Sequence, residues 1–373
     1  MTADLITGCL AGAQFAFRCD APDLCDYTRI HLAPSASDQT SAPAVTAMLR
    51  WHDGQPPANR AALSSELSGL QRLDRDIYAS NDRLWWFRVD DLRDLHLRFA
   101  WADNGLKVEG DFYYRLGNTR ASDRIRRVRQ WRRRRALRQR RFSTLLYYLV
   151  YYPCWWWLEQ MQDLHPIHAA GVDTGDGVVL LAGASGVGKS TLAVALAGLP
   201  GAALLSDSFV LHHGTKVFGV REPVLLDDWS VRWLGAQARD LRRIDGRFCL
   251  DREGYHPPSA GIADGGEAAL LVFPRRAPFA FVRPLSATEA CQRLSAVDLI
   301  VNDLRRYWAF AAVLEQMFPA GLVAQRERHL AQLTAAVPCY DVGVTAEMTS
   351  TAAAQSIVQL MRAQPPRAAG AHL

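Results

Sequence analysis

The stretch of sequence that decides the fold reads Gly183-Ala184-Ser185-Gly186-Val187-Gly188-Lys189-Ser190-Thr191. It follows an apolar run from Val178 to Ala182, a pattern typical of a buried parallel strand. Residues 190–197, which come next, are rich in Leu and Ala, a composition typical of a helix. The sequence therefore predicts a strand, a glycine-rich turn and a helix in direct succession.

The glycines of this turn predict a site for phosphate. Four residues separate Gly183 from Gly188, and Lys189 and Ser190 follow, which is the spacing of a P-loop. Glycines let the backbone curl so that several N–H groups point into one concavity, and the positive end of the helix dipole adds to it. We expect Lys189 to reach the β- and γ-phosphates of ATP and the Ser190 hydroxyl to bind Mg²⁺. All nine residues of the stretch are candidates for nucleotide binding.

The composition suits a globular protein with an uneven charge. The chain has 373 residues, which favours two or three domains, and 49% of the residues are hydrophobic, ample for globular cores. Its net charge is +5, but residues 121–141 alone hold eleven arginines and one aspartate, so this segment carries about +10 and the remainder about −5. A basic segment on a mildly acidic protein disfavours nucleic-acid binding over the whole surface. The basic residues are almost all arginines, and the only lysines of the chain are Lys107, Lys189 and Lys216.

The cysteines and the N-terminal residues indicate a cytoplasmic protein. The seven cysteines are scattered, with no C-x-x-C pair, which indicates reduced thiols rather than a disulfide framework or a zinc site. The first residues include Asp4 and lack a basic segment, so we expect no secretory signal.

Composition and patterning divide the chain into four predicted segments: a β-rich or α+β accessory unit that docks the substrate (1–118), an Arg-rich connector with an aromatic helix (119–159), an α/β nucleotide domain (160–362) and a disordered tail (363–373). In the first segment, residues 95–101 alternate in hydropathy, turn residues follow, and residues 106–112 form a second run. This arrangement predicts a β-hairpin.

The basic connector and the aromatic stretch after it leave several interpretations open. Residues 124–141 fit a solvated linker helix, which we favour, a docking surface for an acidic peptide or protein, or a contact with membrane or nucleic acid. Residues 145–158 are apolar for fourteen residues, which is short for a membrane span. We interpret them as a core helix that is kinked near Pro153 and packs under the sheet of the nucleotide domain. Contact of residues 124–158 with a membrane surface is the alternative.

The nucleotide domain also offers a carboxylate near the phosphate site. Residues 202–207 are predicted to form a buried strand that ends in Asp207, eighteen residues after Lys189. Phosphoryl transfer needs a phosphate cradle, a metal ion, a base for the incoming hydroxyl and positive charge near the transferred group. Asp207 is the candidate for the base and, with Ser190, for the metal ligands. Further predicted elements are strands at 167–172, 270–274 and 339–344, a hairpin over 209–220 and helices over 286–318 and 351–361.

These motifs resemble the catalytic domain of HPr kinase/phosphorylase. His168 stands fifteen residues before Gly183, and Leu204-Leu-Ser-Asp207 follows the glycine-rich stretch, as in that family. The chain is more closely similar to HPr-kinase-related kinases of gene clusters for ribosomally made peptides, including lasso peptides. Phe273-Pro-Arg275, Pro284-Leu-Ser-Ala-Thr-Glu289-Ala and Pro338-Cys-Tyr340 match their pattern. The resemblance covers about residues 160–360 and implies an α/β P-loop kinase fold like that of phosphoenolpyruvate carboxykinase.

The resemblance also implies a function and a set of site residues. Asp207 takes the position of the family's first carboxylate, the base and metal neighbour, and His168 that of its active-site histidine near the γ-phosphate. Ser208 stands where the family often has a second acid, so it is a candidate for metal binding without charge. Arg221 and Arg275 are candidates for phosphate or substrate contacts, because arginine suits bidentate phosphate binding.

We therefore expect an ATP- and Mg²⁺-dependent kinase that phosphorylates a hydroxyl, most simply of serine, on a peptide or small protein such as a ribosomal peptide precursor. A homo-oligomer is expected from the resemblance alone. Two alternatives stay open: a nucleotide-binding regulator or scaffold with little transfer activity, which Ser208 motivates, and a small-molecule kinase.

Overall fold

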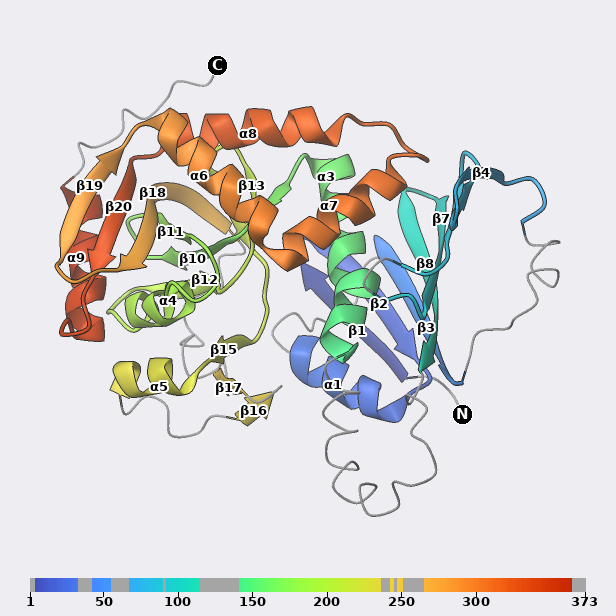
Figure 1. The fold of residues 1–373 in the computed structure, drawn as a ribbon, viewed down its shortest axis with the longest axis horizontal. Helices are drawn as coiled ribbons and strands as arrows, with labels where there is room; N and C mark the ends of the chain where they lie inside the picture. The colour runs from blue at the N-terminus through green and yellow to red at the C-terminus, as the bar shows by residue number, and fades with distance from the viewer. Residues whose placement is uncertain are drawn as a thin grey trace, which may run out of the picture. The chain divides into compact units, whose positions relative to one another are not determined.

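The computed structural model describes residues 4–32, 42–54, 67–89, 92–114, 141–235, 242–244, 247–250 and 265–363 (Figure 1). The protein is a mixed α/β structure with two large mixed sheets. It divides into two compact units, one of Met1–Asp163 with Arg306–Leu322 and the other of Leu164–Arg305 with Val323–Leu373. Most of the predicted Arg-rich connector and nearly all of the predicted tail lie outside the described residues.

The first unit is built on an eight-stranded sheet with the order β1-β2-β3-β8-β7-β6-β5-β4. Its strands are β1 (Asp4–Leu10), β2 (Ala13–Cys19), β3 (Val45–Asp53), β4 (Gln71–Asp74), β5 (Ile77–Ala79), β6 (Arg83–Trp86), β7 (Leu95–Ala102) and β8 (Gly105–Tyr114). Strand β3 runs parallel to both β2 and β8, and helix α1 (Pro22–Leu32) lies between β2 and β3 in the chain. The predicted hairpin is confirmed, because β7 pairs antiparallel with β8.

The aromatic stretch belongs to this first unit, so our expectation that it packs under the sheet of the nucleotide domain is wrong. A π-helical turn, η3 (Tyr147–Tyr151), runs directly into helix α3 (Tyr152–Gln162), with Pro153 in its first turn. Both pieces pack on β2, β3 and β8. Tyr152 also packs against Tyr307 and Phe310 of helix α7 (Asn302–Leu314), with ring centroids 5.6 and 5.7 Å apart.

The helix geometry changes at Tyr152, next to Pro153, whereas the kink itself stays a prediction. Proline has no N–H to donate to the preceding turn, and the helix changes there from π to α geometry. Tyr148, Tyr151, Tyr152, Trp155 and Trp156 are almost completely buried, as expected of a core helix. Within the part of the chain that the structure describes, no helix combines the length and the apolar character needed to cross a bilayer.

The second unit carries the glycine-rich stretch on a nine-stranded mixed sheet. Its strands follow the order β12-β10-β11-β18-β14-β13-β9, with β20 parallel to β18 and β19 antiparallel to β20. They are β9 (His165–Ile167), β10 (Ala169–Asp173), β11 (Val178–Ala182), β12 (Ala203–Ser206), β13 (Val210–His213), β14 (Lys216–Gly219), β18 (Gly265–Arg276), β19 (Phe281–Leu285) and β20 (Cys339–Val344). A smaller sheet has the order β15 (Val224–Leu226), β17 (Arg247–Leu250) and β16 (Arg242–Ile244).

Helices cover both faces of the nine-stranded sheet, which explains why β11 is apolar throughout. Val179 and Leu181 belong to the core that includes α4 (Lys189–Ala197), α5 (Asp228–Leu234) and α9 (Ser350–Arg362). Val178, Leu180 and Ala182 belong to the opposite core, with α6 (Ala287–Ile300) and α8 (Leu322–Ala336). In Figure 1, α6 and α8 lie on one side of these strands and α4 on the other. Successive side chains of a strand point to opposite faces, so a strand buried on both sides reads as a continuous apolar run.

Candidate functional site

The glycine-rich stretch forms a loop between β11 and α4, so the predicted strand, turn and helix are confirmed. Gly186 and Gly188 have φ values of 86° and 100°, a backbone region that residues with side chains rarely adopt. An added Cβ at either position would meet nothing within 4 Å, so there is open space beside the loop at both glycines. Helix α4 begins at Lys189, and its positive dipole end therefore faces the loop.

Lys189 lies inside this loop rather than in solvent. Its side chain is buried, and Nζ donates hydrogen bonds to the carbonyl oxygens of Gly183 at 2.7 Å and Ala184 at 3.2 Å. Burial lowers the pKa of Lys189 to about 8, although the negative charge of Asp207 acts in the opposite direction. The ammonium group of Lys189 is therefore held against the backbone of the loop.

Asp207 comes directly after β12 and is 4% exposed. Buried hydrogen bonds hold the end of this strand in place: Ser206 Oγ lies 2.5 Å from the carbonyl oxygen of Phe209 and 2.9 Å from that of Val220. Strand β12 is not the sheet neighbour of β11, since β10 lies between them. The carboxylate nevertheless lies close enough to Lys189 to shift its pKa. Ser208, the next residue, is half-buried.

His168 is the single residue between β9 and β10, so the strand is interrupted there. Its side chain lies near the charge of Lys189. Its ring is almost buried and packs against Phe209, with ring centroids 5.1 Å apart. Burial and the positive charge of Lys189 lower the pKa of His168 to about 3, and the backbone of Ser208 acts in the opposite direction. The imidazole is therefore neutral at physiological pH. The structure thus brings His168, Lys189 and Asp207 together.

Asp298 of α6 supports this arrangement, and the sequence patterns did not indicate it. Its Oδ1 accepts a hydrogen bond of 2.9 Å from the backbone N–H of His168, the residue at which the strand breaks. The carboxyl group is 4% exposed, and burial raises its pKa to about 8. Asp298 therefore fixes the backbone at His168, although the two residues are 130 positions apart in the sequence.

This buried acid makes stability depend on pH in a predictable way. Between about pH 4 and pH 8 the folded chain keeps a proton on Asp298 that the unfolded chain releases, so the free energy of unfolding falls as pH rises through this range. Asn keeps the acceptor oxygen but not the ionisation. We expect Asp298→Asn to become more stable relative to the wild type as pH rises, by at most about 1.4 kcal/mol per pH unit.

Chemical denaturation at pH 5 and pH 8 measures this change. Asp228→Asn, at an exposed acid of α5, is the control and should differ from the wild type equally at both pH values. An equal difference at both pH values for Asp298→Asn would show that the buried carboxyl does not titrate as described.

The two candidate arginines have different surroundings. Arg221 directly follows Val220, whose carbonyl oxygen lies 2.9 Å from Ser206 Oγ at the end of β12. Arg275 is directed to the neighbouring strand instead: its Nε lies 3.3 Å from Oδ1 of the buried Asp341, and its guanidinium lies over the ring of Phe281. Arg283 and Arg293 contact the same carboxylate at 3.3 and 3.2 Å. A role of Arg221 or Arg275 in binding phosphate stays a prediction.

The first turn of α4 is braced by α5. The buried hydroxyl of Thr191 lies 2.6 Å from that of Ser230, so it faces α5, whereas Ser190 is half-buried. On α5, the ring of Trp229 stacks on that of Trp233. The guanidinium of Arg276 lies over the Trp229 ring, 4.1 Å from its centroid. These packing contacts were not predicted. They leave the Ser190 hydroxyl, rather than that of Thr191, as the better candidate for a metal ligand.

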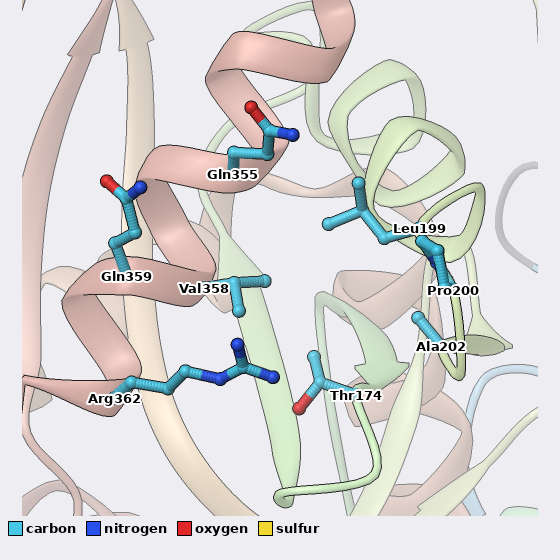
Figure 2. Close-up of a pocket in the computed structure, with 8 residues that line it drawn as sticks. All are labelled: Thr174, Leu199, Pro200, Ala202, Gln355, Val358, Gln359 and Arg362. Carbon is cyan, nitrogen blue, oxygen red and sulfur yellow. The ribbon is translucent and has the colours of Figure 1, made fainter.

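A separate pocket of about 470 Å³ lies at the other end of α4 (Figure 2). It is lined by Thr174, by residues after the C-terminal end of α4 and by one side of α9. Its one charged lining side chain, Arg362, pairs with Asp176 at 3.0 Å. None of the predicted site residues lines it, and the carbonyl end of a helix does not attract phosphate.

Comparison of the chain with protein-family models and with curated proteins found no match.

Proposed function

We propose that this chain is an ATP-dependent kinase that transfers the γ-phosphoryl group to a serine hydroxyl of a peptide or small protein, as its resemblance to HPr-kinase-like enzymes implies. The observation that carries the proposal is the glycine-rich loop with a buried lysine inside it and a buried carboxylate whose charge acts on that lysine. The ammonium group and the free space beside the glycines suit a bound triphosphate. The carboxylate near them suits the activation of a hydroxyl.

Each residue has a role in this scheme. The loop amides and the start of α4 bind the phosphate oxygens, and Lys189 neutralises charge on the β- and γ-phosphates. Asp207 accepts the proton of the incoming hydroxyl or orients it. His168 is neutral and therefore acts as a hydrogen-bonding group rather than as a cation.

The oxygen donors fit a hard cation such as Mg²⁺. Ser190 offers a hydroxyl at the start of α4 and Asp207 a carboxylate, both of which are ligands that Mg²⁺ accepts, and Ser208 adds a second hydroxyl. When bound, Mg²⁺ would neutralise negative charge on the phosphate oxygens. Because Ser208 brings no charge, we expect a weaker metal site than one with two acids.

Incubation with ATP, Mg²⁺ and peptides encoded beside the gene tests the proposal. A substrate should gain about 80 Da, one phosphoryl group, and the gain should be on serine. Nucleotide binding without any mass gain would favour the alternative, a nucleotide-binding regulator or scaffold, which the absence of a second acid at Ser208 motivates. A mass gain on a non-peptide hydroxyl compound alone would favour a small-molecule kinase.

Nucleotide binding itself should take up a proton. At pH 8 about half of the Lys189 side chains are protonated, because the pKa of Lys189 is about 8, and a bound triphosphate would raise that pKa. We expect an uptake of about half a proton per ATP at pH 8, measured by calorimetry in two buffers with different heats of ionisation. The uptake should be preserved in Lys216→Ala, at an exposed lysine of β14. Equal binding heats in both buffers would contradict the placement of Lys189 against the phosphates.

A further inference from the structure

Four of the ten histidines of the chain gather in the second unit, away from the loop. We call His165, His212, His213 and His329 the histidine cluster. His165 begins β9, His212 and His213 end β13, and His329 lies on α8. His165 and His212 are direct partners in the β9–β13 ladder. Three separate elements therefore bring imidazoles to one place.

Two of the four ring spacings match those of ligands around one ion, and the two that involve His212 are wider. The ring centroids of His165 and His213 each lie 4.7 Å from that of His329, and the centroid of His212 lies 6.4 Å from those of His165 and His329. A zinc ion bound to two imidazoles at about 2.0–2.1 Å holds their centroids about 5 Å apart. Ring nitrogens of His213 and His329 already lie within 4.8 Å of each other. Closing the cluster on one ion requires rotation of side chains about χ1 and χ2, above all of His212, whose ring is the farthest from the others.

His212 has the hydrogen bonding of a metal ligand. Its side chain is completely buried, and Nδ1 lies 3.3 Å from the carbonyl oxygen of Gly214, to which only a protonated nitrogen can donate. The lone pair is therefore on Nε2, which is buried and has no hydrogen-bond partner among the described residues. A ligating histidine typically donates its other ring N–H to a carbonyl in this way.

The four histidines differ in burial. His165 and His329 are almost fully buried, whereas His213 is exposed, so the cluster is closed on the protein side and accessible from solvent at His213.

We propose that the histidine cluster binds one divalent transition-metal ion, preferentially Zn²⁺, through imidazole nitrogens of His165, His212, His213 and His329. Imidazole nitrogen ligands suit Zn²⁺ and Co²⁺ and disfavour Mg²⁺ and Ca²⁺. His165 lies three residues before His168, or about 10 Å at the rise of a strand, so this site is separate from the one proposed for Mg²⁺. A bound ion would join β9, at the edge of the sheet, to β13 and α8. The proposal does not depend on kinase activity.

Metal titration of the tag-free, nucleotide-free full chain tests this inference. After treatment with EDTA and dialysis, we expect one Co²⁺ per chain with the intense visible absorption of tetrahedral coordination, displacement of Co²⁺ by one Zn²⁺, and a higher melting temperature with metal. His213→Ala changes an exposed side chain, so it should fold normally without metal, which its melting curve verifies, and should bind Zn²⁺ at least about tenfold more weakly.

His52→Ala, at a histidine of β3 in the first unit, is the matched control and should bind Zn²⁺ as the wild type does. The proposal is overturned by the absence of stoichiometric binding, by uptake of several ions without tetrahedral absorption, or by an affinity that His213→Ala leaves unchanged.

Discussion

Asp207→Asn is expected to lower the rate of phosphoryl transfer about 10³-fold while the chain still binds ATP. The substitution keeps the size and hydrogen-bonding capacity of the side chain but removes the negative charge and the basic oxygen. A positioned general base contributes about 10²- to 10⁴-fold to a rate, so its loss should dominate the effect. The carboxylate is 4% exposed and follows a strand whose end is fixed by Ser206, so we expect the variant to keep its fold.

Initial rates with saturating ATP and a phosphate-accepting peptide measure this effect, and calorimetry measures the affinity for ATP. Asp176→Asn is the matched control, because Asp176 lies in the same unit, in the turn between β10 and β11, and pairs there with Arg362. The control should turn over at the wild-type rate. An Asp207→Asn variant with wild-type turnover would remove Asp207 as the base.

Lys189→Ala is expected to abolish detectable transfer and to weaken ATP binding about 100-fold or more. Lys189 is the buried cation within the loop, and its two present partners are loop carbonyls that it would exchange for phosphate oxygens. A charge-assisted hydrogen bond to phosphate in a water-poor site is stronger than a neutral one, so its loss acts on both affinity and rate.

The thermal shift caused by ATP gives an independent reading of the same variant. At an ATP concentration of 100 times the dissociation constant, binding stabilises the wild type by about 2.7 kcal/mol, and Lys189→Ala should lose nearly all of this gain. The melting temperature without nucleotide should change little, because removal of the buried ammonium offsets the loss of its two hydrogen bonds. Lys216→Ala should keep the full shift. An ATP-induced shift of wild-type size in Lys189→Ala would place the nucleotide elsewhere.

Local signals explain which parts of the fold could be predicted. The strand, loop and helix around Gly183–Thr191 lie within about twenty residues, and apolar runs, glycines and a Leu/Ala-rich segment mark each piece directly. The β7–β8 hairpin and the β13–β14 hairpin are local in the same sense and were also predicted correctly. Asp207 could be found because it ends a short apolar strand soon after the loop.

Long-range packing explains what could not be predicted. The aromatic stretch is apolar on every side, which indicates burial but not the sheet that buries it, and the structure assigns it to the first unit. Asp298 contacts His168 across 130 residues, and no local pattern distinguishes it from other acids on helices. The histidine cluster joins residues of β9, β13 and α8, so only the fold brings them together.

The most direct test of the central claim, that this loop holds a triphosphate beside a catalytic acid, is a crystal structure with a non-hydrolysable ATP analogue and Mg²⁺. We expect the triphosphate on the backbone amides of residues 183–190, Lys189 Nζ against the β- and γ-phosphates, and the Asp207 carboxylate facing the γ-phosphate. A nucleotide bound elsewhere, for example in the pocket beside α9, or an Asp207 carboxylate turned away from the terminal phosphate, would contradict the claim.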